Sequence, residues 1–209
     1  ALNVFTKVNG YDSYNHHPCG YKLGINKGSW SKKLYLCAAI ETDKGDYVIE
    51  ADDDINPIID SLWHHIAFTY DARAGLNNFK AYMDGLLIGE QTVSGEILQG
   101  DGLFIIGSSA VNGNSKYEID DIRLWNRALT QKELLENQTK NFTGTEDGLK
   151  LFLNFDDTFK DISGNGNDAI PLYLGSIKES NFDPPITNFE TYKISNEVSF
   201  NNKTTNATT

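Results

Sequence analysis

Four oxygen-bearing side chains on one Gly-rich turn form the first group of residues that could do chemistry. They are Asp161, Asn165, Asn167 and Asp168. Ca²⁺ takes about six to eight oxygen ligands from carboxylates, side-chain amides and backbone carbonyls on flexible loops of this kind. The same residue types also form Asx turns without any metal. The residues alone leave both interpretations open.

A second group of carboxylates lies in residues 118–123, which read EIDDIR. Retaining glycosidases need two carboxyl groups that flank the scissile bond, and residues two apart on a strand share a face that could carry both. The place for a second Glu holds Ile122 or Arg123, so we predict that the chain is not an enzyme. Asp120 and Asp121 are adjacent and point to opposite faces of a strand, so we expect only one of them to reach a calcium ion.

The two cysteines, Cys19 and Cys37, lie on either side of a hairpin pattern. Facing residues of an antiparallel pair have a constant sum of numbers, and a turn centred on Gly28 places the two cysteines opposite each other. This geometry predicts a disulfide, and a disulfide indicates an oxidising compartment. The alternative is two separate buried thiols.

Four N-glycosylation sequons point to the same compartment. Their acceptors are Asn137, Asn141, Asn202 and Asn206. A chain so rich in Asn and Thr produces about three such motifs by chance, so their number decides little. Their grouping in polar stretches is the better indication of an extracellular protein.

The charge of the chain excludes two classes of partner. The 209 residues include 18 Lys and Arg against 29 Asp and Glu, which gives a net charge of −11. Nucleic acids and anionic membrane surfaces both select basic proteins, so neither partner is expected. No apolar run approaches the roughly 20 residues of a membrane span, so we expect no membrane insertion. Because the chain begins at Ala1 without a Met, we expect a processed product or a fragment.

Most of the chain has the alternation of short strands separated by Gly and Asx turns. The expected strands are 21–25, 34–36, 63–70, 79–83, 86–88, 103–106, 117–125 and 149–155. Asp84-Gly85 is a strong hairpin signal. One short helix starts with a capping box at Thr130 and Glu133, and its apolar side is formed by Leu129, Leu134 and Leu135. The pattern predicts an all-β fold, an antiparallel two-sheet β-sandwich with one short helix, over residues 1–170.

Five segments in order resemble laminin-G-like jelly-roll domains. They are 62–71 (LWHHIAFTYD), 79–85 (FKAYMDG), 103–107 (LFIIG), 119–129 (IDDIRLWNRAL) and 161–168 (DISGNGND). The resemblance implies the concanavalin-A-like lectin/glucanase sandwich and an extracellular binding or adhesion role. It also implies a calcium site built around Asp161 and its loop, with Asp120 or Asp121 contributing. In this family His64 and His65 would be structural.

The chain departs from the family at both ends. Strands expected before Phe5 are absent, so either the chain is incomplete or its sandwich is closed by a segment from elsewhere. Residues 171–209 read as a linker and tail with one candidate strand within 186–200. Its apolar face would be Tyr192, Ile194, Val198 and Phe200.

We expect this tail strand to pair with the open edge of a neighbouring subunit, because Pro184-Pro185 holds it away from its own domain. Head-to-tail exchange of this kind builds a homopolymer. The alternative is a tail that folds back onto its own sheet.

The leading hypothesis is a secreted, non-catalytic module for adhesion or extracellular assembly. Its partners would be neighbouring subunits, extracellular proteins or glycans. The alternative is a carbohydrate-binding, lectin-like module. That alternative needs an exposed aromatic platform, for which the candidates are Tyr11, Tyr14, Trp30 and Tyr47.

Overall fold

The computed structural model describes residues 2–7, 20–27, 34–51, 62–99, 102–109, 117–156, 158–171 and 193–194. The chain divides into two compact units. Unit 1 contains residues 1–111 and 128–135, and unit 2 contains residues 112–127 and 136–209.

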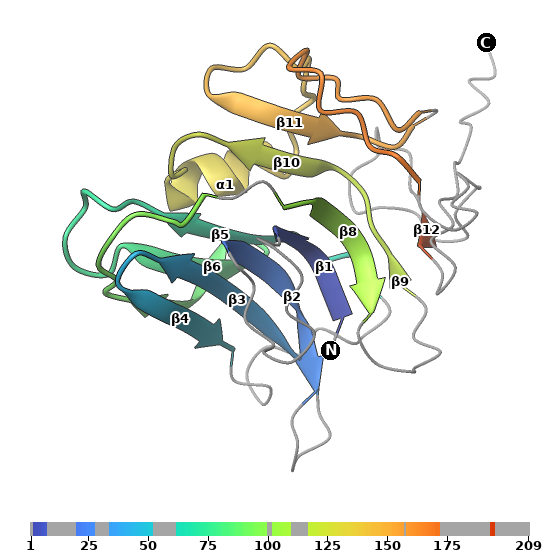
Figure 1. Ribbon diagram of the computed structural model, residues 1–209. Coiled ribbons are helices and arrows are strands. Elements are labelled where there is room, and N and C mark those ends of the chain that lie inside the picture. Colours follow the sequence, from blue (N-terminus) through green and yellow to red (C-terminus); the bar gives the residue numbers. More distant parts are fainter. Residues whose placement is uncertain are drawn as a thin grey trace, which may run out of the picture. The chain divides into compact units, whose positions relative to one another are not determined.

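Unit 1 consists of two antiparallel sheets. The larger has five strands side by side in the order β4-β3-β2-β1-β8 (Figure 1). Their bounds are β1 Leu2–Lys7, β2 Tyr21–Lys27, β3 Leu34–Thr42, β4 Gly45–Glu50 and β8 Phe104–Ser109. The smaller sheet has the order β5-β6-β7. Its strands are β5 Ile66–Tyr70, β6 Phe79–Met83 and β7 Leu86–Gln91.

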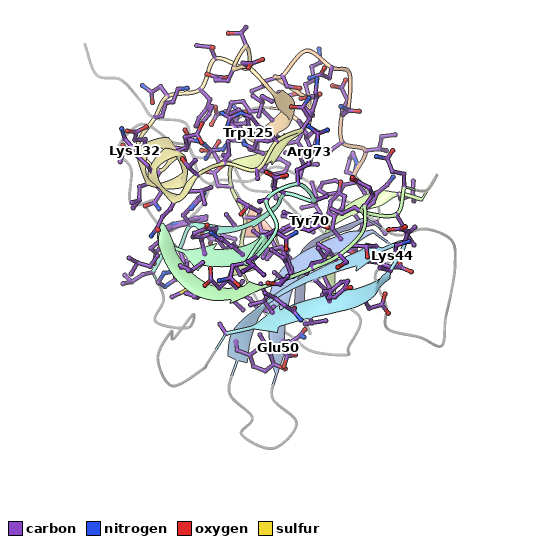
Figure 2. All side chains as sticks on the ribbon, turned by 90° about the vertical axis from the view of Figure 1, so that its left-hand side faces the viewer. Lys44, Glu50, Tyr70, Arg73, Trp125 and Lys132 are labelled. Carbon is purple, nitrogen blue, oxygen red and sulfur yellow. The ribbon has the colours of Figure 1, made fainter. Side chains whose placement is uncertain are left out.

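The two sheets of unit 1 share an aromatic core. Phe5 of β1 lies 5.4 Å from the Phe104 ring and 6.1 Å from the Phe68 ring, measured between centroids. Phe68 in turn meets Phe79 edge-on at 6.0 Å, and Phe79 is fully buried. Tyr70, labelled in Figure 2, also packs edge-on against Phe79, and its hydroxyl donates to the Gly95 carbonyl. Facing sheets that bury rings between them form a β-sandwich, which confirms the predicted fold class.

The β6–β7 turn is formed by Asp84 and Gly85, as the sequence predicts. Their φ angles are 52° and 76°, and positive φ at both central residues is what a type I′ hairpin turn requires. The Asp84 carboxylate accepts a hydrogen bond from the His65 backbone N–H at 2.9 Å and lies 2.8 Å from His64 Nδ1. The turn is therefore bound to the residues that precede β5.

The only helix among the described residues is α1, Gln131–Asn137. Its first turn is the predicted capping box, in which Thr130 N–H donates to Glu133 Oε2 at 2.8 Å and Glu133 N–H donates to Thr130 Oγ1 at 3.2 Å. Leu129 and Leu134 are buried as expected. Leu135 is 45% exposed, so its prediction as part of the apolar side was wrong.

Unit 2 contains two short antiparallel pairs, β10 Ile122–Trp125 with β11 Leu149–Leu153 and β9 Tyr117–Glu118 with β12 Lys193–Ile194. The predicted single strand over 117–125 was wrong, because residues 119–121 are not in a strand. Asp121 has a φ of 51°, which an extended strand does not accommodate. Its N–H donates at 2.9 Å to the Asp120 side chain, Oδ1, instead of to a neighbouring strand.

The described part of the tail pairs within its own chain. In β12, Lys193 faces Glu118 and Ile194 faces Tyr117 of β9. This is the pairing of a tail that folds back on itself. Tyr192, Val198 and Phe200 lie outside the described residues.

The predicted register of the β2–β3 hairpin was wrong. Cys37 faces Gly24, five positions from Cys19, because pairing continues as far as Lys27 and Leu34 and places the turn later than Gly28. Cys37 is a free thiol and only 3% exposed, so the predicted disulfide is not present at Cys37. Cys19 itself lies outside the described residues.

Candidate functional site

Asp161 is the centre of the predicted calcium loop, and it is only 7% exposed. Its Oδ1 accepts hydrogen bonds from the Phe152 N–H and the Ser163 N–H, both at 3.0 Å, and from the Ser163 hydroxyl at 2.6 Å. Its Oδ2 accepts the Asn167 N–H at 3.0 Å. Partial burial raises the pKa of Asp161, but the hydrogen bonds from Ser163, Phe152 and Asn167 outweigh it and hold the pKa below its ordinary value.

The other predicted ligands of this loop also bind the chain itself. Asp168 Oδ1 accepts the Asp161 N–H at 2.9 Å. The Asn165 amide donates to the Leu149 carbonyl at 3.2 Å, and the Asn167 amide donates to the Lys150 carbonyl at 2.9 Å. The structure thus brings the four predicted residues together, in a hydrogen-bond network that fastens the loop to β11.

Asp121 forms an ion pair with Arg123. Asp121 Oδ2 lies 3.2 Å from Arg123 Nη2, and the two side chains are 12% and 10% exposed. The guanidinium also donates to the Asn137 carbonyl at 3.2 Å. Its carbon lies 4.2 Å from the centroid of the Phe142 ring and 5.8 Å from that of Phe152. The sequence analysis did not assign Arg123 this role.

The carboxylates before β10 are shielded from solvent, and their pKa values are raised. Burial, the neighbouring Asp121 and then Asp156 raise the pKa of Asp120 well above its ordinary value. Burial also raises the pKa of Asp121 to about 6, against the opposing effect of Arg123. The next position is Ile122, which is 5% exposed. An acid/base pair on one accessible face, as glycoside hydrolysis requires, is not formed by these residues.

The sequence profile of the concanavalin A-like lectin/glucanases superfamily matches residues 5–135. The chain belongs to this superfamily. It is also 25% identical over 198 residues to Pappalysin-1 of Mus musculus, an alignment that covers 88% of this chain and 12% of that protein. The chain therefore spans about an eighth of the relative's length. No solved structure matches it significantly.

The calcium implied by the superfamily resemblance does not fit the Asp161 loop. Calcium binds oxygen atoms, whereas the Asp161 carboxylate is surrounded by N–H and O–H donors. Asp121 is already paired with Arg123. Over the described residues, no three Asp, Glu, His or Cys side chains form a group that could hold a metal. Calcium binding to this chain stays a prediction without geometric support.

The predicted glycosylation acceptors differ in accessibility. Asn141 is exposed on the loop that follows α1. Asn137 is half-buried at the end of α1, where its carbonyl accepts the bond from Arg123. Asn202 and Asn206 lie outside the described residues. Asn141 is therefore the more accessible acceptor of the two that the structure describes.

Every aromatic side chain whose burial the structure describes is half-buried or buried. Tyr47 is half-buried and faces the same side of the sheet as its partner Ile40, which is 1% exposed. Tyr11, Tyr14 and Trp30 lie outside the described residues. The large exposed apolar side chains are Val48, Leu62, Leu76, Leu86, Leu87, Leu98, Leu103, Leu135 and Ile170. No helix within the described ranges is long and apolar enough to cross a membrane.

Replacing Asp120 with asparagine is expected to raise the free energy of unfolding at pH 7 by about 1 kcal/mol or more. A carboxyl whose pKa is higher in the folded state binds protons more tightly there, so its contribution to stability falls as the pH rises above about 4. Asparagine removes the charged form and keeps an oxygen for the Asp121 N–H. The variant should also lose part of the fall in stability between about pH 4 and pH 7.

Urea denaturation of both proteins in the presence of a chelator, at about pH 4.5 and pH 7, measures the effect. Asp147→Asn, at an exposed position in the same unit, is the control and should change little. A less stable Asp120→Asn protein at both pH values would show instead that the charged carboxylate is stabilising.

Proposed function

We propose that the chain is an extracellular, non-catalytic binding module whose partners are proteins. Membership of the concanavalin A-like superfamily and the similarity to part of Pappalysin-1 support a recognition module of a larger extracellular protein or assembly. The net charge of −11 is consistent with this role and argues against nucleic-acid partners.

The absence of catalysis is supported by the residues before and in β10. The position that would complete a carboxylate pair holds the buried Ile122 or the ion-paired Arg123. Asp121 is the partner of that arginine, and its charge is therefore not available to a substrate. A glycosidase of this fold needs both carboxyl groups beside the sugar.

The chemistry of the surface favours a protein over a glycan partner, and this observation carries the proposal. Sugars are commonly held against aromatic rings, whose flat faces match the apolar face of a pyranose. The residues whose side chains the structure describes leave every aromatic ring half-buried or buried. They expose nine large aliphatic side chains. Aliphatic side chains add buried apolar area in a protein interface without requiring a flat ligand.

A glycan array probed with the purified chain tests the choice between the two partner classes. We expect no retention above background on the array and no release of reducing ends from soluble β-glucans. Specific glycan binding that is lost on replacing Tyr11, Tyr14 or Trp30 with alanine would support the lectin alternative and overturn the protein-binding proposal. Substitution of the half-buried Tyr47 is the matched control for loss of folding.

A second element of the proposal is assembly by exchange of the tail strand. The β9–β12 pair joins only two residues on each side, and residues 172–192 connect β12 to the rest of the chain. Pairing of two-residue strands is weak, and the same register is available to a β12 strand supplied by another copy. Exchange between copies would link subunits head to tail.

Deleting residues 186–209 is expected to convert assemblies of the full chain into monomers, because the deletion removes β12. Light scattering coupled to size exclusion, at high and low protein concentration, measures the change. Deleting only residues 201–209 is the control, since it leaves Lys193 and Ile194 in place. A full-length chain that remains monomeric at high concentration would show that the tail pairs only with its own β9.

A further inference from the structure

Both oxygens of the Asp161 carboxylate accept hydrogen bonds from the protein, three on Oδ1 and one on Oδ2. An ionised carboxylate offers about four acceptor positions on its two oxygens. Asp161 receives four donors, which are the N–H groups of Phe152, Ser163 and Asn167 and the hydroxyl of Ser163. All four belong to β11 or to the loop itself, so the protein itself solvates the charge, mainly at Oδ1.

The loop also occupies the free edge of β11. The Phe152 N–H donates to Asp161 Oδ1 at 3.0 Å, and the Phe152 carbonyl accepts the Ile162 N–H at 2.8 Å. Both backbone groups of this strand residue are thus paired with the loop, as they would be with a neighbouring strand. The Asn165 and Asn167 amides add bonds to the carbonyls of Leu149 and Lys150 at the same edge.

A calcium ion held by both oxygens of Asp161 would have to replace these donors. The positive ends of N–H and O–H dipoles point at both carboxylate oxygens, and a cation at about 2.4 Å from those oxygens would compete for the same positions. The buried Phe152 N–H, released in this way, would lose its partner at a cost of about 1–3 kcal/mol. The Asn165 and Asn167 side chains are held at β11 by their amide nitrogens, which donate to the carbonyls of Leu149 and Lys150.

We infer that residues 161–168 close over β11 through hydrogen bonds centred on Asp161 and not through a calcium ion. The loop then replaces a strand at the β11 edge, and its stability is independent of calcium. This differs from the metal-held loop that the family resemblance implies. Calcium bound elsewhere in the chain would not change the contribution of Asp161.

Thermal unfolding of the wild-type chain and Asp161→Asn, each in millimolar CaCl₂ and in excess EDTA, tests the inference. Asparagine removes the charge and turns an amide toward the donors, so we expect a loss of about 4–8 °C in Tm. The loss should be the same with calcium and with EDTA. Asp168→Asn, which affects a single hydrogen bond, is the matched control and should lower Tm less.

A wild-type Tm that rises with calcium while the Asp161→Asn Tm does not would overturn the inference, because it would place the ion at Asp161. An equal rise in both proteins would place calcium elsewhere and support it. If Asp161→Asn does not fold, Ser163→Ala provides the same comparison, since it removes one hydroxyl donor and leaves the charge in place. A loss of Tm in Ser163→Ala that differs between calcium and EDTA would then contradict the hydrogen-bonded closure.

Discussion

Replacing Arg123 with alanine is expected to lower the free energy of unfolding by about 3–5 kcal/mol. The guanidinium is 10% exposed and is the partner of Asp121, which is 12% exposed. Its removal leaves a buried carboxylate without its positive charge, and it also opens space beside the Phe142 ring. Breaking a buried ion pair by removing one member costs much more than the pair contributes in net terms.

The comparison that isolates the charge effect is the double variant Asp121→Asn/Arg123→Met. Asparagine tolerates the φ of 51° at position 121, and methionine fills much of the arginine volume. The double variant should recover most of the loss measured by urea denaturation. Arg127→Ala, at an exposed arginine that lies over Trp125, is the matched control and should cost less than about 1 kcal/mol. Equal losses in the free energy of unfolding for Arg123→Ala and Arg127→Ala would contradict the prediction.

Replacing Gly144 with alanine is expected to cost about 3 kcal/mol or more. Gly144 is buried and has a φ of 85°, a conformation that alone costs a side-chain-bearing residue about 1–2 kcal/mol. An added Cβ would overlap the Ile162 carbonyl, which is backbone and cannot rotate away. The loop that carries Gly144 and the 161–168 loop would then have to separate.

Gly164→Ala is the control for backbone strain. Gly164 has a similar φ of 74°, but a Cβ there meets nothing within 4 Å. We expect this variant to lose only the strain energy. Urea denaturation of the two variants separates strain from overlap, and equal losses would show that Ile162 moves freely to accommodate the methyl group.

The parts of the fold that were predicted correctly are those decided by neighbours in sequence. Asp84-Gly85 determines its own turn through two positive φ angles, and Thr130 with Glu133 forms a reciprocal cap within four residues. One failure is also local, since the predicted strand over 117–125 is interrupted at Asp121, whose φ is 51°. The Cys37 register depends on a turn that starts after Lys27, and no local signal fixes its length.

The same distinction applies to the candidate site. The sequence correctly grouped Asp161, Asn165, Asn167 and Asp168, because they lie on one loop. It could not decide between calcium ligands and Asx turns, since that depends on where the Phe152 N–H points. Arg123 was also beyond local reasoning, because its environment is completed by Phe142 and the Asn137 carbonyl, more than ten residues away.

The buried thiol of Cys37 can be used to measure local opening of the five-stranded sheet. Cys37 lies in β3, paired on one side with Gly24 and on the other with Glu50. Burial raises the pKa of the thiol, so little reactive thiolate is present in the closed sheet. In a Cys19→Ser background, the rate of alkylation at Cys37 therefore measures how often local opening of the structure exposes this thiol. A partner that binds the five-stranded sheet and suppresses this opening would slow the labelling. The thiol can therefore detect binding in a crude mixture before the partner itself has been identified.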